Sequence, residues 1–476
     1  MKTSKVFYWV LLGLALGLSM YNITTMPLWG WDESRNGMNA FEMLSNGDYF
    51  NLHYAGKVDN WNSKPPMFIW MVMLCYKLFG TSEFSLRLPS AIAGLIAIHF
   101  VFKLVVLYRK PLYGFFTAFA LLTTSGFMGY HVVKTGDFDA LLFAFVIGGI
   151  YHFVKFIKAS KHLDLGCSLF YFTLAFLTKG FAAFLVLPSL FVFLFLQKRG
   201  KIEKPIYLFA FGIACIPVVW IFTFLLMGKT FSDAEFAGNS LEMMMIYDIW
   251  GRFTGQGYEH TKNWDDYFYF FIYLDSKFHF WYLFFYLTIL LGIVKSWKQQ
   301  LKLSELWQKL MAAPLLLLSL CVIVPLGLFF CLVHSVNSWY LTPLLPFLAI
   351  ISTWSVMKIW ELDYRSAKIF IVLFCLFSLM YRVNKLTIDD EKPIIIQQIE
   401  ANKYSNTNLI VINVPPTQDV LLYLNYNYGN VQYNSIPSIS PDLNEHVGIL
   451  KKKLHQIKFP HTIIAEDDEY AVIKMK

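Results

Sequence analysis

The chain has 476 residues, of which 57% are hydrophobic, 18% aromatic and only 15% charged. A soluble domain carries about 25% charged residues, so this composition indicates a polytopic membrane protein and excludes a soluble one. The net charge of +8 is ordinary for a membrane protein, because lysines gather on cytoplasmic loops. No motif points to nucleic acid, and the cysteines lie in apolar runs without CxxC spacing, so neither a zinc site nor a disulfide framework is indicated.

Apolar runs long enough to cross a bilayer, about 20 residues each, recur along the chain. They predict an all-helical membrane bundle of about eleven transmembrane helices, within a range of roughly 11–13. The predicted spans are 6–26, 88–108, 112–130, 138–157, 165–178, 181–197, 206–227, 278–297, 313–333, 340–360 and 367–383.

Positive charge alternates between the ends of these spans, which predicts their orientation. With the N-terminus inside, every basic cluster falls on the cytoplasmic side, as the positive-inside rule requires. The clusters lie at 109–110, 155–161, 198–204, 295–302 and 358–368. The outward segments are then 27–87, 131–139, 228–277, 334–339 and everything after 384.

Two shorter helices are predicted in the first outer segment. Residues 65–80 are too few for an ordinary span, and counting them as one would break the charge alternation, so they predict an interfacial or re-entrant helix entered through Pro65–Pro66. Residues 35–44 predict an amphipathic helix that ends before Asn46–Gly47.

The composition becomes polar after residue 383, which divides the chain into a transmembrane domain (1–383) and a small extracytoplasmic α/β domain (384–476). Strand-like runs lie at 409–414, 463–466 and 470–474, and helix-like stretches at 393–402 and 443–458. This tail has no glycine-rich phosphate loop and no catalytic constellation.

Three charged residues stand at the start of the first outer helix. Asp32 and Glu33 could cap that helix, since helix N-termini favour carboxylates. A cap needs only one acid, however, and it leaves Arg35 unexplained. The alternative is a catalytic role, with Asp32 as the base, Glu33 as a second candidate and Arg35 as a contact to a phosphate.

Two lysines have a similar pair of interpretations. Lys64 precedes Pro65–Pro66, whose fixed φ angles make the turn rigid. It could be a snorkelling lysine at the membrane interface or a point-charge contact to a phosphate. Lys179, which precedes Gly180, could simply end a span or provide a second phosphate contact.

Asp137 and Asp139 directly precede or begin an apolar run. An aspartate there is costly unless it faces a cavity or a partner, so a catalytic role stands beside the simpler interpretation of helix capping. Their spacing also resembles a metal-binding acid pair, although the sequence leaves any metal unknown.

Further polar and aromatic residues occupy the later outer segments. Arg252, His260 and Trp264 lie in or beside a stretch with Gly251, Gly255 and Gly257 that could close over a substrate as a lid or belong to an interfacial aromatic belt. His334 and Tyr340 flank a short outward turn and are candidates for polar substrate contacts.

These motifs together resemble the polyprenyl-phosphate-dependent membrane glycosyltransferases of the GT-C class. The resemblance rests on WDESR at 31–35, NGDYF at 46–50, KPP at 64–66 and YKLFGTSEFSLRLPSAIAGL at 76–95, and it extends over roughly residues 1–360. The nearest families are the aminoarabinose transferases of lipid A and the protein O-mannosyltransferases (glycosyltransferase family 39 type). The resemblance implies the GT-C helical bundle.

The resemblance also implies roles for individual residues. The base falls on Asp32, the phosphate contacts on Arg35 and Lys64, and the second acid on Asp139, with Asp137 as the rival. A glutamate that helps some relatives to hold a metal is replaced here by Ser63, although His260 could match its histidine partner. No cofactor is therefore certain, and a divalent metal remains open.

The resulting hypothesis is an inverting transfer of a hexosyl or pentosyl group from a polyprenyl-phosphate donor. The acceptor would be lipid A, another lipid, a glycan or a protein. The enzyme would lie in a bacterial inner membrane, with the active site facing the periplasm or the cell exterior. The alternative is a transporter or flippase of a lipid-linked sugar, which would place its binding charges near the bilayer midplane.

Overall fold

The computed structural model is mostly helical, as the sequence predicts. The described residues are 2–59, 62, 64–198, 200, 204–226, 250–251, 254, 268, 272, 276–333, 337–362, 364–386, 392–401, 408–412, 418–428, 431–434, 445–450 and 460–475. Each predicted span coincides with or overlaps a helix: α1 (Lys2–Met20), α4 (Glu83–Val106), α5 (Pro111–Leu122), α6 (Phe138–Ala159), α7 (His162–Lys179), α8 (Leu187–Gln197), α9 (Lys204–Leu226), α14 (Trp281–Lys298), α16 (Pro314–Leu332), α17 (Leu345–Trp360) and α18 (Arg365–Leu386). The predicted all-helical membrane fold is confirmed.

Seven apolar helical segments in the described part of the chain are long enough to cross a membrane. The shorter apolar helices, which include 5–20 and 111–122, do not reach that length by themselves. The predicted count of about eleven spans therefore stays a prediction, although a helix lies at each of the predicted positions.

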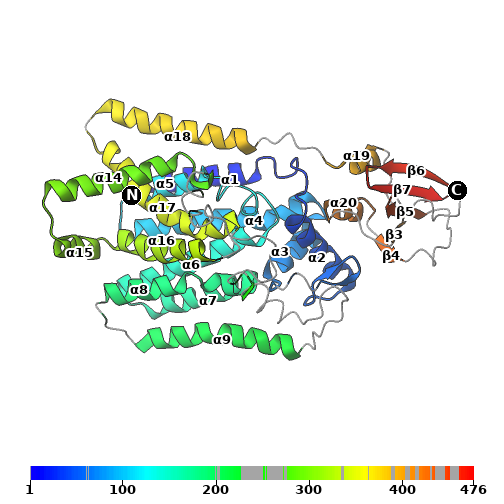
Figure 1. Cartoon of the computed structure of the whole chain (residues 1–476), viewed down its shortest axis with the longest axis horizontal. Coiled ribbons are helices and arrows are strands. Elements are labelled where there is room, and N and C mark those ends of the chain that lie inside the picture. Colours follow the sequence, from blue (N-terminus) through cyan, green and yellow to red (C-terminus); the bar gives the residue numbers. More distant parts are fainter. Residues whose placement is uncertain are drawn as a thin grey trace.

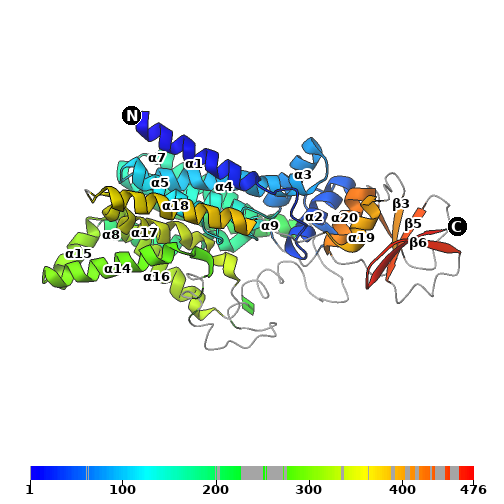
Figure 2. The same ribbon diagram turned by 90° about the horizontal axis from the view of Figure 1, so that it is seen from above.

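The helices of the bundle run roughly side by side, and the two ends of the bundle differ (Figure 1). The N-terminus, the short helix α15 (Leu303–Met311), the end of α8 and the starts of α9 and α18 lie at one end. This is the arrangement that the charge alternation predicts for the cytoplasmic loops. The opposite end carries α2, α3 and the C-terminal sheet, and the view from above agrees (Figure 2).

The first predicted outer segment folds as a helix, a short hairpin and a second helix. Helix α2 (Asp32–Asn46) ends at Gly47, whose left-handed backbone (φ 74°) suits glycine. The hairpin pairs β1 (His53–Tyr54) with β2 (Lys57–Val58). Helix α3 (Met67–Phe79) follows and buries Phe68 and Val72 while exposing Leu74 and Leu78. Both predicted helices are confirmed, and the position of α3 relative to a bilayer stays a prediction.

The C-terminal residues form a five-stranded mixed sheet of order β4-β3-β5-β7-β6. Its strands are β3 (Asn408–Ile412), β4 (Val431–Asn434), β5 (Glu445–Leu450), β6 (His461–Glu466) and β7 (Tyr470–Met475), and its helices are α19 (Ile394–Ala401) and α20 (Gln418–Tyr428). The three predicted strands and the helix at 393–402 are confirmed. The helix predicted over 443–458 is wrong at 445–450, because this run is the central strand β5, paired on both sides.

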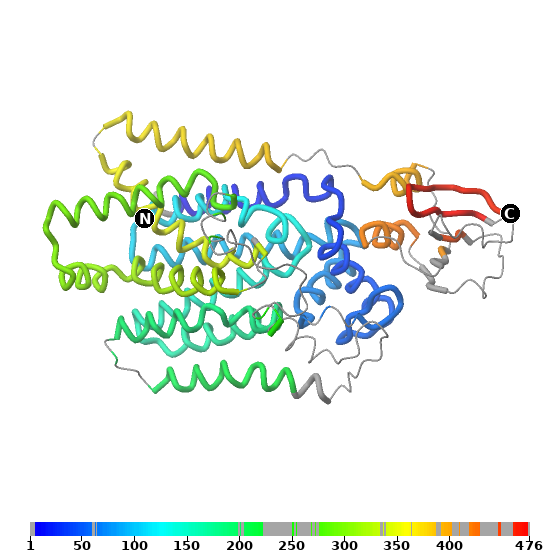
Figure 3. The backbone as a smooth tube through the Cα atoms, viewed as in Figure 1, coloured from blue at the N-terminus to red at the C-terminus, as the bar shows by residue number. Residues whose placement is uncertain are grey.

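Helix α20 packs against α2 and its neighbours and so connects the C-terminal residues to them. The backbone N–H of Leu28 donates to the Tyr423 hydroxyl at 2.8 Å, and the hydroxyls of Tyr76 and Tyr426 lie 2.7 Å apart. A side chain at Gly37 of α2 would collide with a leucine of α20. The tube view in Figure 3 shows α20 between α2 and the sheet. The division into domains at 383/384 stays a prediction.

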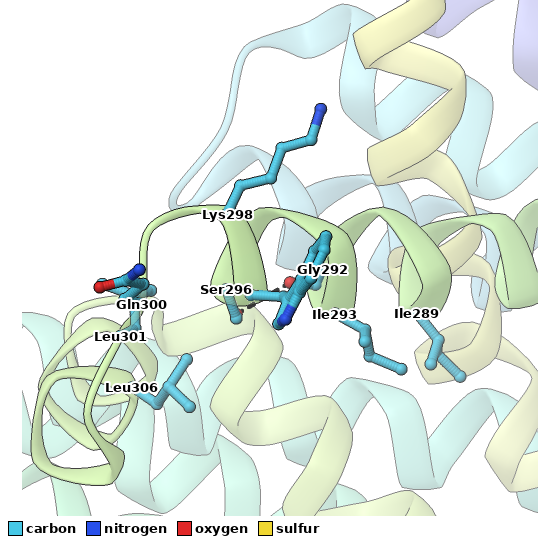
Figure 4. Close-up of a pocket in the computed structure, with 9 residues that line it drawn as sticks. Ile289, Gly292, Ile293, Ser296, Lys298, Gln300, Leu301 and Leu306 are labelled. Atoms are coloured by element: carbon cyan, nitrogen blue, oxygen red, sulfur yellow. Dashed lines mark hydrogen bonds between the residues drawn. The ribbon is translucent and has the colours of Figure 1, made fainter.

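A cavity of about 830 Å³ lies between α14 and α15, at the end that holds the N-terminus. Its lining is mainly apolar and includes Ile289, Ile293 and Leu306, whereas Lys298 points away from it (Figure 4). No carboxylate lines this cavity. The residues that could carry chemistry therefore lie elsewhere, at the opposite end of the bundle.

Candidate active site

The connection between α5 and α6 is joined to the start of α2 at Gly136. The Gly136 N–H donates to Glu33 Oε1 at 2.7 Å, and Asn36 Nδ2 donates to the Gly136 carbonyl at 3.1 Å. A β-carbon at this glycine would approach the Leu86 side chain to 2.5 Å, so the close approach requires glycine. The join places the first residue of α2 next to the residues that precede α6.

Asp32 is the first residue of α2, and its carboxylate lies in the resulting cluster. Its side chain is 36% exposed, and one oxygen is 3.7 Å from His131 Nδ1. Burial raises the pKa of the Asp32 carboxyl and the charge of Asp137 adds to this rise, while Lys64, His131 and Lys179 act in the opposite direction. A carboxylate with a raised pKa that stays open to solvent is suited to accept a proton.

His131 connects the two acids. Its Nδ1 lies 2.8 Å from Asp137 Oδ2, and its ring stacks on Trp339 with a centroid distance of 3.7 Å. Burial lowers the pKa of the imidazole, but the hydrogen bond and charge of Asp137, together with Asp32, outweigh burial and raise it. The backbone of His131 is left-handed (φ 60°), which is uncommon for a residue other than glycine.

Asp137 and Asp139 occupy different places in this cluster. Asp137 caps α6 by accepting the Phe138 N–H at 2.6 Å, so the capping interpretation holds for it while its other oxygen meets His131. Burial alone would raise the pKa of Asp137, but the hydrogen bond from His131 and the charge of Lys179 outweigh burial, so this pKa is lowered. Asp139 instead forms an ion pair with Lys179 at 2.5 Å.

The two predicted phosphate-binding lysines both reach this end of the bundle. The buried Lys179 ammonium, at the end of α7, lies over the Tyr340 ring at 5.0 Å as well as against Asp139. Lys64 lies over the Phe138 ring at 5.3 Å, and its only polar contact within the described residues is Asn62 Oδ1 at 3.5 Å. Lys64 is therefore a cation beside the acids without a carboxylate partner among the described residues.

Glu33 differs from its predicted catalytic role. Its side chain is 1% exposed and lies against Arg87. One oxygen accepts from Arg87 Nε and Gly136 N, and the other accepts from Arg87 Nη2 and Trp29 N, all at 2.7–2.8 Å. These donors occupy the acceptor sites of a carboxylate. Glu33 therefore holds α2 in place and has no free oxygen for a substrate.

Arg35 lies against a carboxylate of its own loop. Its Nη2 and Nε donate to the two oxygens of the buried Asp59 at 2.6 and 2.8 Å, and its guanidinium lies 4.8 Å from the Tyr54 ring. Burial raises the pKa of Asp59, but the hydrogen bond and charge of Arg35 outweigh this and lower it. Arg35 is thus paired with Asp59, as Lys179 is paired with Asp139, and its predicted contact to a phosphate stays a prediction.

The remaining predicted contacts cannot be placed. Arg252, His260, Trp264 and His334 lie outside the described residues. Tyr340 is described and lies beside Lys179. The sequence reasoning did not single out His131 or Asp59, although His131 lies in the same predicted outward segment as Asp137.

Asp32, His131 and Asp137 are the described residues that could hold a metal ion. One ligand atom from each lies within 4.8 Å of the others. Oxygen and imidazole ligands bind a divalent ion such as zinc at about 2.0–2.2 Å, so small movements would bring these atoms to that distance. The donor set fits a divalent cation. Ser63 and His260, the positions at which a metal was considered from the sequence, lie outside the described residues.

Comparisons with known proteins agree on one class of fold. Residues 63–222 match the family described as dolichyl-phosphate-mannose-protein mannosyltransferase. The structure of ArnT from Cupriavidus metallidurans bound to undecaprenyl phosphate superimposes with a TM-score of 0.68, covering 98% of this chain and 97% of that one at 15% identity. An Archaeoglobus fulgidus oligosaccharyltransferase gives a TM-score of 0.55, covering 94% and 70% at 11% identity. The chain has the fold of these membrane proteins.

Particular relatives also emerge from the sequence. An undecaprenyl phosphate-alpha-4-amino-4-deoxy-L-arabinose arabinosyl transferase of Pseudomonas aeruginosa is 24% identical over 374 residues, 72% of this chain and 58% of the relative. An uncharacterized protein of Aquifex aeolicus is 30% identical over 203 residues, 42% of this chain and 39% of the relative. The chain thus aligns with less than two thirds of these relatives. The predicted resemblance to GT-C membrane glycosyltransferases is confirmed, and the chain is a multi-pass membrane protein.

Proposed function

We propose that this chain is a membrane glycosyltransferase that moves a sugar from a polyprenyl-phosphate donor to an acceptor outside the cytoplasm. The observation that carries the proposal is the convergence of Asp32, Lys64 and Lys179 at one end of the bundle. They come from the start of α2, the turn before α3 and the end of α7, and the charges of both lysines act on the Asp32 carboxylate. A base and two cations in one place match the needs of a donor whose leaving group is a phosphate.

The chemistry follows from the charges of these groups. Asp32 takes the proton of the acceptor hydroxyl or amine as the acceptor atom bonds to the anomeric carbon. The bond from that carbon to the phosphate oxygen breaks on the opposite face, so configuration inverts and no covalent intermediate forms, as in the base-assisted logic of inverting glycosidases. The leaving polyprenyl phosphate gains negative charge, which Lys64 and Lys179 stabilise in a partly water-excluded site.

The other acids act through their partners. Asp139 holds the Lys179 ammonium at 2.5 Å, and Asp137 holds the His131 ring at 2.8 Å beside Asp32. If a divalent cation binds, Asp32, His131 and Asp137 would hold it, and it would supply further positive charge for the phosphate. Arg35 of the first outer loop is held by Asp59 at 2.6 Å and stabilises that loop.

The proposed sugar class rests on the names of the matching family and of one relative. The family is described by a mannosyl transfer and the relative by an aminoarabinosyl transfer, so the proposed group is a hexose or a pentose. The acceptor is a lipid such as lipid A, another lipid, a glycan or a protein. The proposed location is a bacterial inner membrane, with α2, α3 and the C-terminal sheet on the periplasmic or exterior side.

The test separates transfer from transport of the same donor. Purified protein in lipid vesicles receives a radiolabelled polyprenyl-phosphate sugar and a mixture of envelope lipids and glycans. A transferase releases free polyprenyl phosphate as the label moves to an acceptor, and Lys64→Ala slows this release while the control Lys57→Ala, an exposed lysine of the hairpin, does not. A donor that only changes leaflet and stays intact would show a flippase instead.

A further inference from the structure

A second group of charged side chains comes from the α5–α6 connection, the segment before α14 and the end of α18, and its members are all cations. The group consists of Lys134, Lys277 and Arg382, named here the cation cluster. The charge of Arg382 acts on both lysines. None of the three has a carboxylate partner among the described residues. The chemistry proposed for Asp32 makes no use of them.

Lys134 fixes one side of the cluster and has a structural role. Its side chain is 1% exposed, and its ammonium donates to the carbonyls of Leu18, Ser19 and Tyr21 at the end of α1. A cation is favourable at this end of a helix dipole. Burial lowers the pKa of Lys134 to about 7, and the charges of Arg87 and Arg382 add to this effect.

Arg382, near the end of α18, is the member without a structural explanation. Its side chain is only 5% exposed, and its Nε has no hydrogen-bond partner. Ser378, one turn earlier on the same face of α18, also buries its hydroxyl without a partner. A snorkelling arginine would carry its head to water, but this guanidinium is buried.

Lys277 completes the cluster from a third segment. Its carbonyl accepts the Gly126 N–H at 3.0 Å, which packs the segment before α14 against the α5–α6 connection. Burial lowers the pKa of Lys277, and the charge of Arg382 lowers it further. Lys277 is half-buried and Arg382 is buried. Like charges of this kind with an unsatisfied donor are unfavourable unless an anion joins them.

The surroundings of Arg382 indicate where that anion comes from. The outer face of α18 exposes large apolar side chains, among them Leu373, Phe377 and Met380, and the helix runs along the outside of the bundle (Figure 1). Its end meets the end of α1, where Asn22 Nδ2 donates to the Leu386 carbonyl at 3.3 Å. Arg382 thus lies at the end of the predicted span 367–383, on the inner face of a helix whose outer face is apolar.

We propose that Arg382, Lys277 and Ser378 form an anion site that binds the phosphate of a membrane lipid at the adjoining ends of α1 and α18. A planar guanidinium can hold two phosphate oxygens at once, and the serine hydroxyl and the ammonium supply further donors. This site is separate from the Asp32 cluster, and its existence does not depend on the proposed transfer reaction. Under the proposed transfer, the role of this site is to hold a lipid substrate by its phosphate.

The experiment measures lipid retention by native mass spectrometry of the purified full-length protein in detergent. The probes are phosphatidic acid, phosphatidylcholine and inorganic phosphate, each added alone. We expect the wild type to retain phosphatidic acid in preference to phosphatidylcholine. Arg382→Gln should weaken that retention by about 10- to 100-fold, the usual loss for a charge-assisted hydrogen bond. The control Arg365→Gln, at the exposed opposite end of the same helix, should leave it unchanged.

Thermal unfolding in lipid-free detergent separates a binding site from a structural one. If the cations repel one another without a ligand, Arg382→Gln and Lys277→Gln should raise the midpoint by about 2–4 °C and lose the further rise that phosphatidic acid gives the wild type. A lowered midpoint for both variants, unchanged lipid retention, or an equal loss in Arg365→Gln would overturn the proposal. Retention of inorganic phosphate without the lipid would overturn its lipid part. Asp32→Asn should retain phosphatidic acid like the wild type, whatever its activity.

Discussion

Replacement of Lys64 by methionine should remove catalysis while leaving the protein folded. The Lys64 ammonium has no carboxylate partner among the described residues, and within them it donates to Asn62 Oδ1 at 3.5 Å. Its removal therefore leaves no buried anion unpaired. Two unit charges about 4 Å apart at an effective dielectric constant of about 20 interact by about 4 kcal/mol. The loss of one contact to a developing charge typically costs about 3–4 kcal/mol, or a hundred- to a thousandfold in rate.

Lys179 differs from Lys64, because its removal leaves a buried carboxylate without a partner cation. Lys179→Met leaves the Asp139 carboxylate, 5% exposed at its side chain, without its cation. Breaking one partner from a buried pair typically costs about 3–5 kcal/mol of stability. We therefore expect Lys179→Met to lower both the transfer rate and the unfolding midpoint, whereas Lys64→Met lowers the rate alone.

The assay compares initial rates of polyprenyl phosphate release with unfolding midpoints for the two variants and for Lys64→Arg, which keeps the charge. A Lys64→Met protein that transfers sugar within threefold of the wild type would refute the assignment of this lysine to the leaving phosphate. An equal fall in the unfolding midpoint for Lys64→Met and Lys179→Met would refute the argument that only Lys179 has a buried carboxylate partner.

Three further predictions concern the residues that hold α2. Glu33→Gln breaks a buried ion pair and should destabilise the protein by about 3–5 kcal/mol, measured as a lowered unfolding midpoint, and a midpoint within 1 °C of the wild type would contradict this structural role. Asp59 has a lowered pKa in the folded state, so its stabilising contribution is present above the pKa of an unfolded aspartate, about 3.9, and is lost as pH falls below that value. The stability advantage of the wild type over Asp59→Asn should therefore shrink between about pH 5 and pH 2. A difference in stability that stays constant over this range would exclude the linkage. Gly136→Ala should separate α2 from the loop before α6 because its β-carbon meets Leu86, lowering transfer rate more than Gly30→Ala, whose position has open space.

The helices could be predicted from the sequence because their signals are local. Long apolar runs correctly predicted a helix at each of the proposed spans, and Gly47 marked the end of α2 correctly. The C-terminal residues were harder, because strand β5 and helix α20 are defined by partners far along the chain. Helix α20 takes its position from α2 through the contact of Tyr426 with Tyr76, which no local pattern shows.

The candidate site was predictable only where a charge stood against an apolar run. Asp32, Lys64, Asp137 and Lys179 were singled out on that signal, and the structure brings them together. Adjacent residues on a helix point about 100° apart, so Glu33 points into the bundle while Asp32 reaches the cluster.

The partners of these residues could not be predicted, because pairings across the fold leave no local mark. Asp59 lies 24 residues from Arg35, and His131 reaches Asp32 only through the join at Gly136.

The central claim is that Asp32 takes the proton of the acceptor in a transfer from a lipid-linked phosphate donor. The most direct test is a single-turnover measurement with donor prebound to wild type and to Asp32→Asn at equal occupancy. The claim predicts that the wild type releases one free polyprenyl phosphate for each sugar transferred. The rate of this step should fall at least a hundredfold in Asp32→Asn. The control Asp468→Asn, which changes an exposed residue between β6 and β7, should keep the wild-type rate. Release from the Asp32→Asn protein at the wild-type rate would contradict it.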